Sequence, residues 1–323
     1  MKSRNFRRIE DIEPSDYLAI FRNSEILREQ QESGVDCTSI LKGKVVTCIF
    51  AGVSTRTKAM IQIAVSRMGG IFCYENITDQ GYYSKGEESL NETLFSYSQF
   101  SDILIIRHKN LDLMSLGPFV NSPLINAMSG PYEHSLAAIG RAYSIYRKCG
   151  NLSDVAIGIY GSIQLSRPLK SLVKLLSLFE ATIYNDSVLP EMSLSGKILD
   201  AINTNGSKVI ESSINSFIGE IDALFIVEGI PQDICDESTY SLYCEKFKSI
   251  SLEIINNMKK NSLFSVGMPN RLPNKKSTIL PEVQSIFIEE KRNILIDWVY
   301  CTQALICHLL GLSVSIKSES VKK

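Results

Sequence analysis

An excess of charge of either sign is missing from this chain of 323 residues, which carries 34 lysines and arginines against 35 aspartates and glutamates. A formal net charge of −1 gives no reason to expect a nucleic acid or an anionic membrane as partner. Any anion site in this protein must therefore be local.

Metal ligands are few and badly spaced. The chain has three histidines and eight cysteines, and no two cysteines form a C-x-x-C pair. A zinc site of the His/Cys type therefore has no ordinary spacing here. Most cysteines lie in apolar stretches, which is typical of buried, reduced thiols. We expect no metal.

Targeting and membrane segments are also scarce. The N-terminal MKSRNFRRIEDIE is briefly basic but lacks the apolar stretch of a secretory signal. One uncharged run, 298–316, is long enough to span a bilayer, but Thr302, Gln303 and His308 interrupt it. A buried terminal helix ending near Gly311 explains this run better. We expect a cytoplasmic protein that does not enter a membrane.

What the chain does contain is an alternation of short apolar runs and helical patterns. Strands are expected at 45–50, 71–74, 103–107, 123–126, 155–160, 182–184, 223–227 and 263–266, with helices between them that include 56–68, 242–261 and 293–312. Such alternation implies parallel sheets covered by helices on both faces. The length suits two domains, which we place on either side of residues 148–152.

The most informative stretch is Ser54-Thr55-Arg56-Thr57, between an apolar run and an amphipathic helical pattern. A strand that runs into a helix through such a turn offers backbone N–H groups, hydroxyls and a guanidinium to one anion, such as a phosphate. An ordinary N-cap with a solvated arginine explains the same four residues equally well.

Four further segments carry polar side chains near strand ends or helix starts. They are Lys85-Gly86-Glu87, Arg107-His108, His134 and Arg167. Taken singly, each has an ordinary explanation: a solvated loop charge, a surface ion pair, a helix cap. Their order along the chain is more specific than any one of them.

These segments together resemble the aspartate/ornithine carbamoyltransferase family, and within it most closely the aspartate branch. The resemblance runs from about residue 10 to residue 312. It rests on FAGVSTRTKAMIQIAVSRMGG, SKGEESLNETL, DILIIRH, PLINAMSGPYEHSL, GSIQLSRPLKSLVKLL and TQALICHLLGL.

The resemblance implies two doubly wound parallel-sheet domains bridged by helices. Residues 1–150 would bind carbamoyl phosphate, and 151–292 would bind the acceptor amino acid. The last helix, about 293–312, would return to pack on the first domain. Neither a metal nor an organic cofactor is needed for the family's reaction.

Roles for the donor's contacts also follow from the resemblance. The phosphate would be held by Ser54, Thr55, Arg56 and Thr57. Arg107 and His134 would lie on the carbamoyl carbonyl and phosphate, with Thr55 assisting at the carbonyl. Of these residues, Arg56, Thr57, Arg107 and His134 would be catalytic.

The remaining contacts implied by the family lie elsewhere in the chain. Lys85 would reach in from a neighbouring subunit of a homotrimer and touch both substrates, and Met268 would complete the donor site. Arg167 and Glu228 would contact the acceptor, Arg167 through a carboxylate.

Departures from the family's pattern gather on the acceptor side. Glu228 follows a strand, at the position where the aspartate branch has a carboxylate-binding arginine. A glutamate there would repel a second carboxylate of the acceptor and favour a cationic or hydroxylated group. Val266-Gly267-Met268-Pro269 replaces His-Pro-Leu-Pro, and Ala137 replaces a glutamine that meets the carbamoyl amide. Gly52 replaces a glutamate just before the S-T-R-T turn, and Gly81 or Tyr82 replaces a serine donated with the lysine.

Three hypotheses therefore stay open. The first is a carbamoyltransferase that acts on an amino-acid-like amine other than L-aspartate, in specialised metabolism. The second is a genuine aspartate carbamoyltransferase of pyrimidine synthesis with divergent contacts. The third is a catalytically silent relative that only binds.

Overall fold

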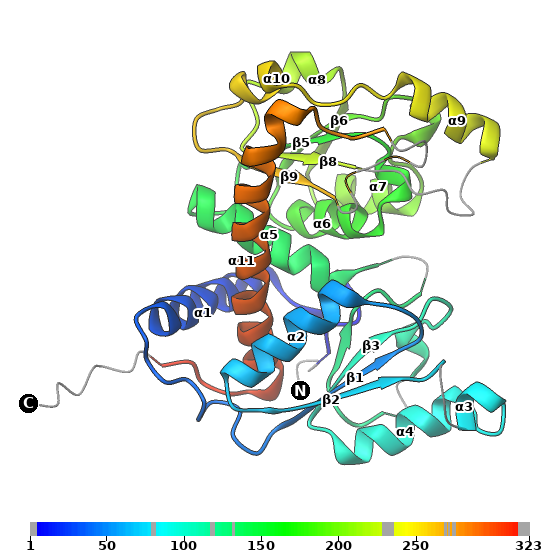
Figure 1. Cartoon of the computed structure of the whole chain (residues 1–323), viewed down its shortest axis with the longest axis vertical. Coiled ribbons are helices and arrows are strands. Elements are labelled where there is room, and N and C mark those ends of the chain that lie inside the picture. The colour runs from blue at the N-terminus through cyan, green and yellow to red at the C-terminus, as the bar shows by residue number, and fades with distance from the viewer. Residues whose placement is uncertain are drawn as a thin grey trace, which may run out of the picture. The chain divides into compact units, whose positions relative to one another are not determined.

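The structure is a computed structural model that describes residues 5–78, 82–116, 120–130, 133–227, 236–267, 270, 272 and 276–315. The chain divides into two compact units: unit 1 holds Met1–Gly140 and Ile296–Lys323, and unit 2 holds Arg141–Leu295. Each unit is built on one parallel sheet (Figure 1). The predicted α/β class with two parallel-sheet domains is therefore confirmed.

Unit 1 has a four-stranded sheet in the order β2-β1-β3-β4. Its strands are β1 (Val45–Phe50), β2 (Ile71–Asn76), β3 (Ile103–Arg107) and β4 (Leu124–Asn126). In this sheet β2 lies on one side of β1 and β3 lies on the other, so the direction in which strands are added reverses after β2. Because parallel crossovers are right-handed, this reversal puts α2 (Thr55–Arg67) and α4 (Leu90–Phe100) on opposite faces, as Figure 1 shows.

Unit 2 repeats this plan with five strands in the order β7-β6-β5-β8-β9. They are β5 (Ala156–Tyr160), β6 (Thr182–Asp186), β7 (Lys208–Glu211), β8 (Ala223–Ile226) and β9 (Leu263–Val266). The helices α6 (Arg167–Ser177) and α7 (Lys197–Thr204) cover one face, and α8 (Ile214–Phe217), α9 (Glu237–Lys246) and α10 (Leu252–Asn256) cover the other (Figure 1).

The remaining helices are α1 (Pro14–Glu32), α3 (Tyr82–Lys85), α5 (Ser135–Cys149) and α11 (Gln284–Leu310). Short 3₁₀ turns are η1 (Ile9–Asp11), η2 (Leu113–Leu116), η3 (Ile163–Leu165), η4 (Pro190–Met192) and η5 (Pro281–Val283). Both α5 and α11 contribute residues to the two units, as expected of helices that bridge two domains.

The C-terminal helix packs against the N-terminal helix, which confirms that the chain returns to its first domain. Arg28 of α1 donates to the buried carboxylate of Asp297 at 2.8 Å, and its guanidinium lies 5.2 Å from the centre of the Tyr300 ring. One segment in the described part of the chain, Pro281–Leu310, is long and apolar enough to cross a membrane, but 67% of its apolar window is buried inside the protein. The helix begins at Gln284, earlier than the predicted 293.

One predicted helix is wrong. Residues 242–261 form the end of α9 and the separate α10, because Phe247 turns into an extended conformation with ψ of 122°. Its buried ring packs 4.9 Å from that of Tyr160, and the Tyr160 hydroxyl accepts a bond from Lys248 N–H at 2.9 Å. Burial of Phe247 therefore overrides the local helical pattern.

The strand β7 and the helix α7 were not expected from the sequence. The residues of β7 are mostly exposed, since it is the edge strand of its sheet. Unlike β9 at the other edge, whose four residues are all buried, β7 therefore lacks the run of apolar residues that predicts a strand.

Candidate active site

The carboxyl edge of the first sheet gathers most of the predicted donor residues. In the register of β1 and β3, Phe50 lies opposite Arg107, and Ala51 N–H donates to the Arg107 carbonyl at 2.7 Å. These two strands flank the point where the strand order reverses. Ligands of doubly wound sheets bind in the crevice at such a point.

The helix α2 begins there with an open N-terminus. Ser54 is its N-cap, with φ of −152° and ψ of 91°, and within the described residues its side chain accepts no cap bond from the first turn. The first turn has no acidic residue either. In contrast, α4 is closed by a capping box in which Ser89 and Glu92 satisfy each other's backbone N–H groups. The N–H groups of the first turn of α2 are therefore suited to an anion.

The four residues of this turn are accessible to a solute. Thr55 and Arg56 are exposed, and Ser54 and Thr57 are half-buried. The exposed Val53 directly precedes them. Hydroxyls and a guanidinium thus border the helix N-terminus at the edge of the sheet.

His134 follows β4 at the same edge. Its side chain is buried, and its carbonyl accepts bonds from Ala137 and Ala138 N–H, both at 3.1 Å, which starts α5. The sheet order puts the ends of β1, β3 and β4 side by side. Ser54–Thr57 and Arg107 therefore lie at or just after the ends of two adjacent strands, and His134 follows the next strand, β4, by eight residues within the same unit.

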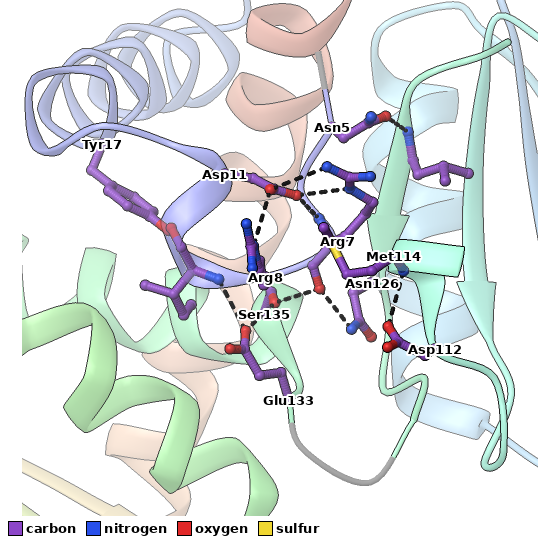
Figure 2. Close-up of polar contacts among 12 residues, drawn as sticks. Asn5, Arg7, Arg8, Asp11, Tyr17, Asp112, Met114, Asn126, Glu133 and Ser135 are labelled. Atoms are coloured by element: carbon purple, nitrogen blue, oxygen red, sulfur yellow. Dashed lines mark hydrogen bonds and ion pairs between the residues drawn. The ribbon is translucent and has the colours of Figure 1, made fainter. Parts of the chain in front are cut away.

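An N-terminal segment holds the start of α5 in place (Figure 2). The backbone N–H of Ile9 donates to the Glu133 carboxylate at 2.9 Å, and Ser135 Oγ donates to the same oxygen at 3.1 Å. The Asn126 side-chain amide donates to the Arg7 carbonyl at 2.8 Å. Arg7 in turn pairs with Asp11 at 3.1 Å. Residues on both sides of His134 are thus tied to the first residues of the chain.

Sequence reasoning missed Asn126 and Glu133. Asn126 ends β4 and is 4% exposed, and Glu133 immediately precedes His134. Their signal was a polar residue at each side of the turn between β4 and α5. One partner of each, Arg7 for Asn126 and Ile9 for Glu133, lies more than a hundred positions away, and no local pattern reveals it.

Lys85 is the last residue of α3, a single helical turn between β2 and α4, and it is exposed. Tyr83 of the same turn packs against an apolar cluster that includes Leu94 and Leu104. The Tyr83 hydroxyl lies 3.0 Å from His108 Nε2.

Arg167 is in unit 2, as the first residue of α6 just beyond the carboxyl end of β5. It is half-buried, and this burial lowers the pKa of its guanidinium. Lys170 lies one turn further along the same helix. Burial, and then the nearby Arg167, lower the pKa of the Lys170 amine. Two cations in the first turn oppose the helix dipole, an arrangement that an anion would relieve.

Glu228 and Met268 lie outside the described residues. Two of the family departures are described. Ala137 is buried in the first turn of α5. Gly52 has φ of 103°, a left-handed conformation in which a glutamate would be strained.

Unit 2 also contains a cavity of about 510 Å³ at the carboxyl ends of β5 and β6. Its lining includes Tyr160, Asp186, Lys248 and Glu253. Arg167 is not part of this lining, so the cavity is distinct from the predicted acceptor contact. Among the described residues, no group of three His, Cys, Asp or Glu side chains is arranged to hold a metal ion.

Comparison with known proteins supports the resemblance to the carbamoyltransferase family. The sequence profile described as "Aspartate/ornithine carbamoyltransferase, carbamoyl-P binding domain" matches residues 4–147. The chain is 28% identical to the aspartate carbamoyltransferase catalytic subunit of Pyrobaculum islandicum, over 83% of this chain and 85% of that protein. The catalytic subunit from Thermococcus kodakarensis is 26% identical, over 98% of both chains.

Solved structures share the fold. The catalytic subunit of M. jannaschii aspartate transcarbamoylase superposes with a TM-score of 0.80 at 22% identity, covering 96% of this chain and 98% of that one. Aspartate transcarbamoylase from Trypanosoma cruzi, in complex with carbamoyl aspartate and phosphate, gives a TM-score of 0.80 at 18% identity, covering 94% and 95%.

Two doubly wound parallel sheets are the architecture that this chain shares with aspartate transcarbamoylase catalytic chains. Residues 4–147 thus match the carbamoyl-phosphate-binding domain of the aspartate/ornithine carbamoyltransferase family, and most of the chain is similar to aspartate carbamoyltransferase catalytic subunits.

Proposed function

We propose that this chain transfers the carbamoyl group of carbamoyl phosphate to the amine of an amino-acid-like acceptor. The observation that carries the proposal is the open N-terminus of α2, bordered by Ser54–Thr57 and placed beside Arg107 at the point where the strand order reverses. A dianionic phosphate satisfies both the helix dipole and the guanidinium groups.

The reaction suits these groups. A neutral amine attacks the carbamoyl carbon, negative charge builds on the carbonyl oxygen, and phosphate leaves. Arg107, His134 and the Thr55 hydroxyl are donors suited to that oxygen, while Arg56 and Thr57 hold the leaving phosphate. Donors that are already in place before the reaction stabilise the developing charge, usually the largest catalytic contribution. The departing phosphate can accept the amine proton, so the reaction needs no further base.

Rigid placement of His134 supports its role. Glu133 and Ser135, its two neighbours, are bonded to the N-terminal segment. A donor that does not need to reorganise loses little free energy when charge develops.

We further propose a homotrimer in which Lys85 enters the site of a neighbouring subunit and meets both substrates. The exposure of Lys85 on a short helical turn supports this role. Residues 1–150 then bind the donor, and 151–292 bind the acceptor.

For the acceptor, we propose an amine other than L-aspartate. Arg167, with Lys170 beside it, would hold one carboxylate. Glu228 in place of an arginine disfavours a second carboxylate and suits a cationic or hydroxylated group. The buried Ala137 offers a methyl group where the family has a carboxamide, which leaves the carbamoyl amide to other partners.

L-Aspartate is the second candidate, because the relatives compared above are aspartate carbamoyltransferases by name. One assay separates the two. The purified protein is given carbamoyl phosphate and a panel of amino acids, and phosphate release and ureido product are both measured. We expect turnover with a mono-carboxylic, cationic or hydroxylated amine. Robust turnover with L-aspartate alone would refute the altered acceptor, and binding of carbamoyl phosphate without any turnover would identify a silent relative.

Arg56→Ala tests the donor site itself. Loss of charge-assisted bonds worth about 2–3 kcal/mol should weaken carbamoyl phosphate binding roughly 30- to 150-fold in calorimetry. Arg67→Ala is the matched control, because Arg67 lies in the last turn of the same helix. Equal affinities for the two variants would show that the phosphate does not bind at the helix N-terminus.

A further inference from the structure

The turn α3, which carries Lys85, contacts the residue that follows β3, the strand that ends at Arg107. The Tyr83 hydroxyl lies 3.0 Å from His108 Nε2, and the two rings meet edge to face with centroids 6.3 Å apart. Tyr83 is two residues before Lys85, and His108 is the residue after Arg107.

His108 is itself held firmly. Its backbone N–H donates to Ser129 Oγ at 3.1 Å, and its carbonyl accepts from Leu111 and Gly130 N–H, both at 3.1 Å. Ser129 Oγ also donates to the Ile106 carbonyl at 2.8 Å. The backbone that carries the imidazole is therefore held in place by hydrogen bonds at the end of β3.

Tyr83, in contrast, belongs to a short and mostly exposed element. The turn α3 has four residues, too few for a stable isolated helix. Its anchors include the apolar contacts of the Tyr83 ring and the bond of the Tyr83 hydroxyl. Removal of that bond leaves the direction of the turn less defined.

We infer that the Tyr83–His108 pair positions Lys85, and so makes Tyr83 and His108 positioning residues for carbamoyl transfer. The inference rests on the proposed function, in which Lys85 contacts the substrates. The Tyr83–His108 contact also links two elements of one subunit. One is the end of β3, whose Arg107 serves the subunit's own site, and the other is the turn α3, which presents Lys85 to the neighbouring subunit. A subunit whose β3 end is well ordered would present Lys85 in a defined place.

The pair also explains why a bond of modest strength can matter. A neutral hydrogen bond contributes about 0.5–1.5 kcal/mol net, too little to decide whether unit 1 folds. The same free energy can decide the fraction of molecules in which an exposed lysine is correctly placed, because misplacement by about 1 Å can lower a rate 100-fold.

A double-mutant cycle tests the inference with the full-length protein. Tyr83→Phe retains the ring and deletes the hydroxyl. We expect it to lower kcat/KM about 3- to 10-fold while the melting temperature falls by only about 1–6 °C, as the loss of one neutral hydrogen bond implies. His108→Phe, which retains an aromatic ring beside Tyr83, should give a similar loss. Tyr97→Phe is the control, since Tyr97 packs on the same apolar cluster and its hydroxyl bonds to Glu75.

The decisive measurement is Tyr83→Phe in a Lys85→Ala background. If Tyr83 acts through Lys85, the second substitution should change kcat/KM less than 1.5-fold. Additive losses, or a Tyr83→Phe protein as active as Tyr97→Phe, would overturn the inference while the function stands. If Lys85→Ala alone is fully active, the role of Lys85 in the proposed function fails instead, and the positioning inference with it.

Discussion

Asn126 is the buried side chain whose removal should damage both the stability of unit 1 and its candidate site. Its carboxamide is 4% exposed and makes three short bonds. The oxygen accepts from Met128 N–H at 2.9 Å and from Ser129 N–H at 2.6 Å. The amide donates to the Arg7 carbonyl at 2.8 Å, a bond drawn in Figure 2. Met128 is a non-glycine residue with φ of 88°, so these bonds also hold a strained turn.

Asn126→Ala deletes these three bonds, together with a longer one from the same amide to the Ser129 carbonyl at 3.4 Å. At about 1 kcal/mol for each short bond, the free energy of unfolding should fall by about 3 kcal/mol, and the melting temperature by roughly 6–12 °C for a unit of this size. The turn also places Ser129, which bonds to His108 and Ile106 on either side of Arg107. The KM for carbamoyl phosphate should therefore rise.

Calorimetric melting and steady-state kinetics test both effects. The control is Asn205→Ala in unit 2, which deletes a single bond to Ser177 Oγ at 2.9 Å and should lower stability by about 1 kcal/mol with KM unchanged. If Asn126→Ala melts within about 2 °C of the parent protein and binds donor normally, Asn126 does not organise this edge of the sheet.

Three further outcomes follow from the site. Lys170→Met removes one of the two cations at the start of α6, and should raise the KM of a carboxylate acceptor about 5-fold without changing that of carbamoyl phosphate; equal changes in both would refute the assignment. Burial lowers the pKa of His108 below its usual value near 6.5, so the contribution of the neutral imidazole to stability is complete above pH 6.5 and declines as the pH falls below it. The free energy of unfolding in urea should therefore decline less between pH 7.5 and pH 5 for His108→Phe than for the parent protein. An identical decline in the two proteins would contradict this assignment. Glu228→Arg should shift acceptor preference toward dicarboxylic amines, and an unchanged product profile across the panel would exclude Glu228 from the acceptor site.

Local patterns in the sequence predicted the inner strands well. β1 and β3 begin and end where their apolar runs do, because strands buried on both faces need continuous apolar residues. The edge strand β7 and the break at Phe247 were missed. Pairing with β6 decides the first, and burial of one aromatic ring decides the second.

The candidate site likewise contains some residues that the sequence reveals and others that it does not. Ser54–Thr57, Arg107, His134 and Arg167 were recognisable in the sequence, since strand-to-helix junctions have local signals in turn and capping residues. Their supports, Asn126, Glu133 and the Tyr83–His108 pair, were not, because each bonds to a residue far away in the chain.

By itself, the sequence determined the α/β class, the chemistry available at each strand end and the resemblance to the carbamoyltransferase family, because these depend on residue types at short spacing. Only the tertiary structure decided that the N-terminus of α2 is left uncapped, that Arg107 stands opposite Phe50 where the strand order reverses, and that Lys85 is tethered through Tyr83 to His108. Strand order and long-range hydrogen bonds arise from packing of the whole unit, which no short stretch of sequence encodes.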